Sequence, residues 1–86
     1  MPEISRFYGI VIAMFHNDHE PPHFHVRYGE HKALVSIGEA AVLRGDLPSR
    51  ALGLVREWTR SHRTELHEDW LLARENQPLK PIEPLQ

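Results

Sequence analysis

Residues 23–37 decide the fold, and they read His23-Phe24-His25-Val26-Arg27-Tyr28-Gly29-Glu30-His31-Lys32-Ala33-Leu34-Val35-Ser36-Ile37. Apolar and polar side chains alternate from His23 to Tyr28, which is the pattern of a half-buried strand, and a second run follows the Gly29-Glu30 dipeptide from His31 to Ile37. A glycine in first position meets the requirement of a two-residue type II′ hairpin turn. The stretch therefore predicts an antiparallel hairpin.

The two-residue turn also predicts the register of this hairpin. It opposes six pairs: Tyr28 with His31, Arg27 with Lys32, Val26 with Ala33, His25 with Leu34, Phe24 with Val35, and His23 with Ser36. Because side chains alternate between the two faces, one face is apolar, with Phe24, Val26, Tyr28, Ala33 and Val35. The other face carries His23, His25, Arg27, Lys32 and Ser36 around Leu34. We expect this polar face to be functional or exposed to solvent.

The segments on either side extend the sheet. Residues 4–16 are rich in β-branched and aromatic side chains and predict one central strand. A loop follows, stiffened by Pro21 and Pro22, which lack backbone donors and hold the chain extended. After the hairpin, residues 41–44 predict a short further strand.

The apolar period changes to 3.6 residues after Gly45. Asp46 is the predicted N-cap of a helix, with Pro48 in its first turn. Its apolar face comprises Leu47, Ala51, Leu54, Val55, Trp58 and His62, beside a basic stripe of Arg56, Arg60 and Arg63. A second helical stretch over residues 63–75 presents Leu66, Trp70 and Ala73, and the pattern leaves open one kinked helix or two. The predicted fold is α+β: an antiparallel meander of three to four strands, followed by one or two C-terminal helices packed on one sheet face.

Length and composition narrow the class of protein. A chain of 86 residues predicts a single domain, 1–86, with residues 77–86 as a Pro-rich extended tail. The absence of cysteine excludes disulfides and thiolate metal sites and favours a reducing compartment. A net charge of −2 gives no overall basic field. Because the sequence shows neither a signal peptide nor an apolar stretch of membrane-spanning length, we expect a cytoplasmic protein without membrane contact.

Histidine is the unusual component, with seven in the chain. His23 and His25 are two residues apart on a predicted strand, so both point to one face and can share zinc or another divalent metal. Asp18, His19 and Glu20 in the preceding loop could supply a further ligand, with Asp18 and His19 as the chosen candidates. One hypothesis is therefore a metal site of Asp18, His19, His23 and His25.

The same face supports a second hypothesis without metal. His23 and His25 can exchange protons near neutral pH, and Arg27 and Lys32 can stabilise a phosphate, which is the requirement of a metal-independent ribonuclease acting on RNA. A third interpretation is structural, with these histidines on a half-exposed sheet face. The sequence leaves open whether the protein is an enzyme, because it contains no phosphate-binding glycine loop, nucleophile elbow or cysteine nucleophile.

Several motifs carry a resemblance to a known family. They are the opening Met-Pro-Glu-Ile-Ser-Arg-Phe-Tyr-Gly-Ile over residues 1–10, Asn17-Asp18-His19, Pro21-Pro22-His23-Phe24-His25-Val26, Tyr28-Gly29-Glu30 and Leu47-Pro48-Ser49-Arg50-Ala51-Leu52. The chain resembles small bacterial proteins of domain-of-unknown-function family 4160. The family supplies no activity, but its members are often encoded beside another small protein, in an arrangement similar to a toxin–antitoxin pair. The resemblance implies a bacterial interaction module with a small protein partner encoded by a neighbouring gene, and a homo-oligomer stays open.

Overall fold

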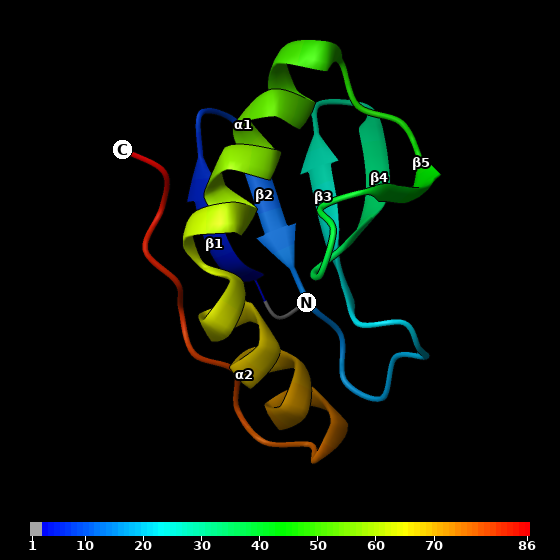
Figure 1. Cartoon of the computed structure of the whole chain (residues 1–86), viewed down its shortest axis with the longest axis vertical. Helices are drawn as coiled ribbons and strands as arrows, with labels where there is room; N and C mark the ends of the chain where they lie inside the picture. Colours follow the sequence, from blue (N-terminus) through cyan, green and yellow to red (C-terminus); the bar gives the residue numbers. More distant parts are fainter. Residues whose placement is uncertain (1–2) are drawn as a thin grey trace.

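A computed structural model describes residues 3–86, which form one sheet followed by two helices. The elements are β1 (Glu3–Phe7), β2 (Ile10–Ala13), β3 (His23–Tyr28), β4 (His31–Ser36), β5 (Val42–Gly45), α1 (Ser49–Ser61) and α2 (Arg63–Arg74). The strands are antiparallel neighbours in the order β1-β2-β3-β4-β5 (Figure 1). The predicted α+β meander with C-terminal helices is confirmed, with five strands in place of three or four.

The additional strand comes from the segment predicted as one central strand, and that prediction was wrong. Tyr8 and Gly9 both adopt positive φ, at 50° and 80°. Two consecutive residues of this kind form a type I′ turn, which reverses the chain and sets Phe7 opposite Ile10. The run of apolar residues is therefore a hairpin, and Gly9 inside it was the signal.

The central hairpin agrees with the sequence in every pair. All six predicted pairs between β3 and β4 are present, from His23 with Ser36 to Tyr28 with His31. Gly29 has a φ of 59°, and the following Glu30 does not share it, as a type II′ turn requires. A two-residue turn leaves no slack for another register, which is why local sequence was sufficient here.

The last strand begins one residue later than predicted and ends at Gly45. This glycine has a φ of 82°, and a Cβ atom there would lie 2.1 Å from the carbonyl oxygen of Lys32. Only glycine tolerates both the left-handed backbone and this approach. Gly45 therefore lets β5 close against β4.

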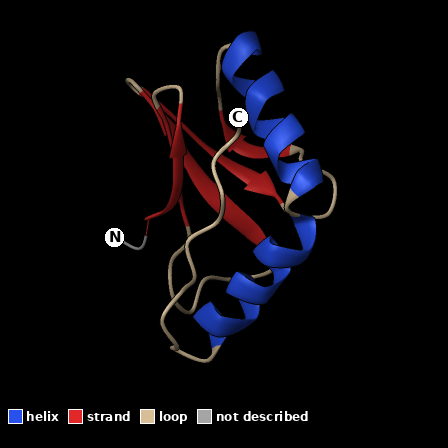
Figure 2. Ribbon diagram, turned by 90° about the vertical axis from the view of Figure 1, so that its left-hand side faces the viewer, coloured by secondary structure: helices blue, strands red, loops and turns tan. Residues whose placement is uncertain are grey.

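Both helices lie on one face of the sheet (Figure 2). The apolar face of the hairpin is buried beneath them, as predicted, and Phe24 and Val35 belong to the same core as Val55, Trp58 and Leu66. A helix buries its apolar stripe while the sheet buries alternate residues, so the two periods meet in one core. Neither helix within residues 3–86 has the length and apolar character needed to cross a membrane.

The junction and the start of the helices differ in detail from the prediction. The chain forms two helices, because His62 leaves helical geometry and serves as the end of α1 and the start of α2. Pro48 occupies the N-cap of α1 without a side-chain hydrogen bond, so the prediction of Asp46 as N-cap was wrong. Asp46 lies too far upstream of Ser49 to reach the free N–H groups, and its Oδ2 lies 3.2 Å from Nδ1 of His31.

The predicted basic stripe is partly structural. Arg56 Nε donates to the carbonyl oxygen of Ala40 at 3.1 Å, and Arg63 Nε donates to that of Ile37 at 3.1 Å. Both carbonyls belong to the turn between β4 and β5, where they lack strand partners. Arg60, between them, is exposed. Two of the three arginines therefore tie the helices to this turn.

The C-terminal residues run back along the sheet without forming a helix or a strand (Figure 2). The backbone N–H of Ile82 donates to the carbonyl oxygen of Ile4 at 2.7 Å, and Trp58 Nε1 donates to that of Glu83 at 2.9 Å. The Ile82 side chain is buried in the core. This Pro-rich segment thus covers part of the outer edge of β1.

Candidate metal centre

The loop of residues 14–22 enters β3 and is held against the end of α2. His16 Nε2 lies 3.0 Å from the carbonyl oxygen of Gln77, and the backbone N–H of Asn17 donates to Ala73 at 3.3 Å. Glu20 forms an ion pair with Arg74. These contacts place Asp18 over the first residues of β3.

The carboxylate of Asp18 contacts three histidines. Its Oδ2 lies 3.0 Å from Nε2 of His23 and 2.9 Å from Nε2 of His25. Its Oδ1 lies 3.0 Å from Nδ1 of His19 and accepts the backbone N–H of the same residue at 3.0 Å. Oδ2 of Asp18 therefore contacts the imidazoles of both His23 and His25, while the hydrogen bond from the backbone N–H of His19 to Oδ1 orients the carboxylate.

The tautomer of His23 follows from its partners. Its Nδ1 lies 2.7 Å from the carbonyl oxygen of Pro21, which only accepts hydrogen bonds, so Nδ1 carries the proton. In the neutral ring, the lone pair of Nε2 would then face the Oδ2 atom of Asp18, and two acceptors repel. The ring is 2% exposed, so water offers little relief. A cation belongs between these atoms, either a second proton on His23 or a metal ion.

His25 occupies the more open side of the cluster. Its side chain is 30% exposed, and the ring lies edge-on to Phe15 with centroids 4.3 Å apart. His23 instead packs inward, with its ring centroid 5.4 Å from that of Trp70 in α2. The cluster is therefore closed to solvent at His23 and open to solvent at His25, and we call this open side its mouth.

Asp18 is ionised at neutral pH. Burial acts to raise the pKa of its carboxyl, but hydrogen bonds from His25 and from the backbone N–H of His19, with the charge of His23, outweigh burial and lower the pKa to about 2. An ionised carboxylate is the form that binds a metal ion.

Three of these groups have the composition of a metal site. One oxygen of Asp18 and one ring nitrogen each of His23 and His25 lie within 4.8 Å of one another. Zinc bound at about 2.0–2.1 Å separates tetrahedral ligands by roughly 3.3 Å, so the two distances from Asp18 Oδ2 to the histidine nitrogens, 3.0 and 2.9 Å, would need to lengthen by only a few tenths of an ångström. Two histidines and one carboxylate suit zinc, iron, manganese or nickel. Three protein ligands leave a position for water or another ligand.

The structure separates the predicted residues into groups. Asp18, His23 and His25 converge, whereas the side chain of His19 is 83% exposed and contacts only the other oxygen of Asp18. Of the residues predicted for phosphate chemistry, Arg27 and Lys32 are exposed beyond His25 on the same face. Sequence reasoning missed the Pro21 carbonyl that orients His23 and the ring of Trp70 behind it, because no local pattern marks either contact.

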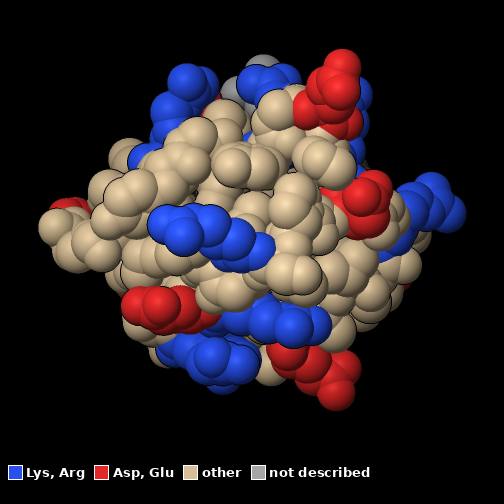
Figure 3. Space-filling model, turned by 90° about the horizontal axis from the view of Figure 1, so that it is seen from above, with Lys and Arg blue, Asp and Glu red and all other residues tan. Residues whose placement is uncertain are grey.

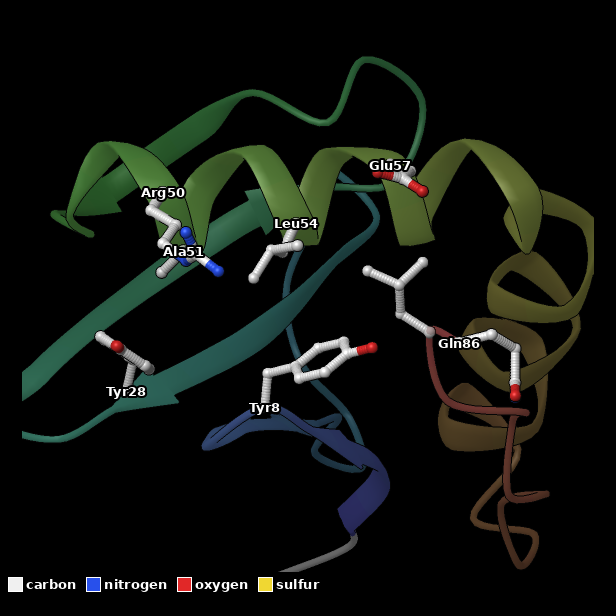
Figure 4. A pocket seen from close by; sticks show the side chains of 8 residues that line it. Tyr8, Tyr28, Arg50, Ala51, Leu54, Glu57 and Gln86 are labelled. Atoms are coloured by element: carbon white, nitrogen blue, oxygen red, sulfur yellow. The ribbon is translucent and has the colours of Figure 1, made fainter.

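A cavity of about 490 Å³ lies between α1 and the sheet, away from the Asp18 cluster (Figure 4). Tyr8 and Tyr28 line the sheet side, and Arg50, Leu54 and Glu57 come from α1. It brings no group of metal-binding side chains together among the described residues. Among residues 3–86, the group of metal-binding side chains that the fold brings together is therefore the Asp18 cluster.

The fold and this cluster define a small α+β protein with a histidine–carboxylate centre at the start of its third strand. Residues 9–71 match the family described as "Domain of unknown function (DUF4160)", and the chain belongs to this family. The matched residues include Asp18, His23 and His25. No curated protein and no solved structure matches the chain.

Proposed function

We propose that this protein binds one divalent metal ion through Asp18, His23 and His25. The observation that carries the proposal is the buried His23 ring. Its Nδ1 is committed to a carbonyl, and its Nε2 points at an ionised carboxylate beside a second imidazole. A backbone carbonyl on the distal nitrogen is the usual way in which proteins orient a metal-binding histidine. Such an ion would be reached from the solvent on the side of His25, whose side chain is 30% exposed.

A proton on His23 is the competing occupant of the same place. An imidazolium would pair with Asp18 without any metal, and the cluster would be structural. The two cases separate by pH, because metal binding must displace protons from histidine. We expect metal affinity to fall as the pH is lowered, because protons compete with the metal for the histidine nitrogens.

The test is a metal titration of protein purified without a histidine tag. We expect about one ion per chain by elemental analysis and calorimetry, and at least about 100-fold weaker binding in Asp18→Asn and His25→Ala, since direct ligands matter more than their supporting partners. His31→Ala is the matched control, because His31 also contacts an aspartate but lies outside the cluster. His23 is left intact, since its ring is part of the packing against Trp70. Zinc, nickel, iron and manganese all far below one per chain would refute the proposal.

The metal-independent ribonuclease receives less support from the geometry. Both ring nitrogens of His23 are engaged and the ring is buried, so His23 is poorly placed to exchange a proton with a substrate. His25, Arg27 and Lys32 stay accessible for such a role. Cleavage of RNA in the presence of a chelator, lost in both His25→Ala and Arg27→Ala, would establish this alternative.

We also propose a small protein partner in the bacterial cytoplasm, as in a toxin–antitoxin-like pair. The outer edge of β5 supports a partner, because it pairs with no strand among residues 3–86 and can accept a strand from another chain. The neighbouring gene product is the partner that the family resemblance implies, and the absence of cysteine fits a reducing compartment. Co-expression with the neighbouring gene product should give a complex on size-exclusion chromatography and relieve any growth arrest caused by one protein alone. Unchanged growth and separate elution would refute this proposal.

A further inference from the structure

The sheet face that the helices leave uncovered contains a groove with a volume of about 430 Å³. Val11, Ala13 and Leu34 form its apolar floor, and Arg27, Lys32 and Arg44 are the cations among its lining residues. His25 also lines it. The groove therefore opens directly onto the mouth of the metal centre.

The strand registers explain why these residues meet. Arg27 opposes Lys32, and Leu34 opposes both His25 and Arg44. His25 and Arg27 are two residues apart on one strand, so their Cα atoms are about 7 Å apart on the same face. A phosphate bound by Arg27 would therefore lie on the same sheet face as the proposed metal site, beside His25.

The charge of the groove stands out against that of the chain. The protein has a net charge of −2, and seen from above, acidic and basic side chains are interspersed around the molecule (Figure 3). Yet no carboxylate lines the groove within residues 3–86. Glu3, on the same face, is paired with Arg6 through both of its oxygens. The three groove cations are exposed and make no side-chain hydrogen bond to the described residues, so they are available to an anion.

We infer that this groove binds single-stranded nucleic acid. The three cations hold successive phosphates, and the apolar floor with the ring of Phe15 receives a base, the combination that single-strand binding proteins use. The apolar floor favours a base-bearing ligand over a simple polyanion, and the open groove favours a continuous strand. The inference rests on the proposed function only for the position of one phosphate beside the ion; binding itself depends on the cations.

The experiment is fluorescence anisotropy of a labelled RNA or DNA oligonucleotide of about eight nucleotides with the full chain. We expect Arg27→Ala, Lys32→Ala and Arg44→Ala each to weaken binding at least about fivefold and to lower the salt dependence by about one unit of slope per lost contact. Arg60→Ala is the control, because Arg60 is exposed on α1, which covers the opposite face. Thermal melting verifies that each variant is folded.

Two results would overturn the inference. One is that the three groove variants bind as the wild type does, or that Arg60→Ala weakens binding equally. The other is that a polyglutamate peptide competes with the oligonucleotide at equal affinity and depends on the same three cations, which would assign the groove to acidic protein segments.

A second readout separates this inference from the metal proposal. With Mn²⁺-loaded protein, we expect paramagnetic broadening of the phosphorus resonances of the bound oligonucleotide, and its loss in Asp18→Asn, which should still bind the strand. Binding without any metal uptake would refute the metal proposal and leave the groove standing. Metal uptake without binding of any oligonucleotide would refute the inference about the groove and leave the metal proposal standing.

Discussion

The two faces of the sheet are formed by the same strands, but one face is buried in the core and the other borders an open groove. On the covered face, Phe24, Val26 and Val35 are buried in one core with Val55 and Trp58 of α1. On the open face, the residues between them, His25, Arg27 and Leu34, border the groove. Because neighbouring residues on a strand point in opposite directions, parity separates these two sets of residues, with the buried His23 beside Trp70 as an exception. Substitutions should therefore separate stability from ligand binding.

The largest expected effect belongs to the centre of the covered face. Trp58→Ala removes a fully buried ring that contacts Phe7 and Phe24, and we expect it to lower the free energy of unfolding by about 3–5 kcal/mol. Urea denaturation measures this loss, and Val55→Ala provides a milder change of the same kind. Leu71→Ala, at an exposed position of α2, should change stability by less than about 0.5 kcal/mol. Equal losses for Trp58 and Leu71 would contradict the position of the core.

The second-largest effect on stability is expected at Gly45, the last residue of β5. Gly45→Ala introduces a Cβ atom 2.1 Å from the backbone oxygen of Lys32 at a positive φ. We expect a loss of about 2 kcal/mol or more by thermal or urea unfolding, because backbone must move to relieve the contact. Gly53→Ala is the matched control, since nothing lies within 4 Å of its added Cβ and it belongs to a helix. That variant should gain roughly 0.5–1 kcal/mol.

The Asp18 cluster adds a pH-dependent contribution to stability of comparable size. Asp18 has a pKa lowered to about 2 in the folded protein, so its contribution to stability is present above the unfolded pKa of about 4 and disappears as pH falls through 2. In the metal-free protein, we expect the wild type to lose about 2 kcal/mol of unfolding free energy relative to Asp18→Asn between pH 5 and pH 2. Denaturant unfolding across this window measures the difference. Parallel curves for the two proteins would show that the carboxylate is not held by the histidines.

The smallest effect on stability is expected on the rim of the open face. Arg44→Ala and Lys32→Ala should each change the free energy of unfolding by less than about 0.5 kcal/mol, because both side chains are exposed and unpaired within residues 3–86. The same variants weaken nucleic-acid binding if the groove has the role inferred above. A large loss of stability in either variant would contradict the view that residues of the open face contribute little to stability.

The local part of the fold was predictable from sequence. Gly29 and Glu30 set a turn without slack, so the register of β3 and β4 followed. The hairpin of β1 and β2 was missed because Tyr8 contributes a positive φ that a tyrosine rarely adopts, and the apolar run hid the glycine beside it. Asp46 was misassigned as a helix cap because the sequence did not show that the helix would begin only after Pro48.

The candidate site also has one part that the sequence predicted and one part that only the tertiary structure decided. Sequence alone determined that His23 and His25 share a face and that Arg27 and Lys32 follow them, because the two-residue period of a strand is a local property of the backbone. Only tertiary structure decided that Asp18, and not His19, joins them. That choice depends on the loop of residues 14–22 being held against Ala73 and Arg74 at the far end of α2, and such contacts between distant segments arise from packing, which no spacing rule contains.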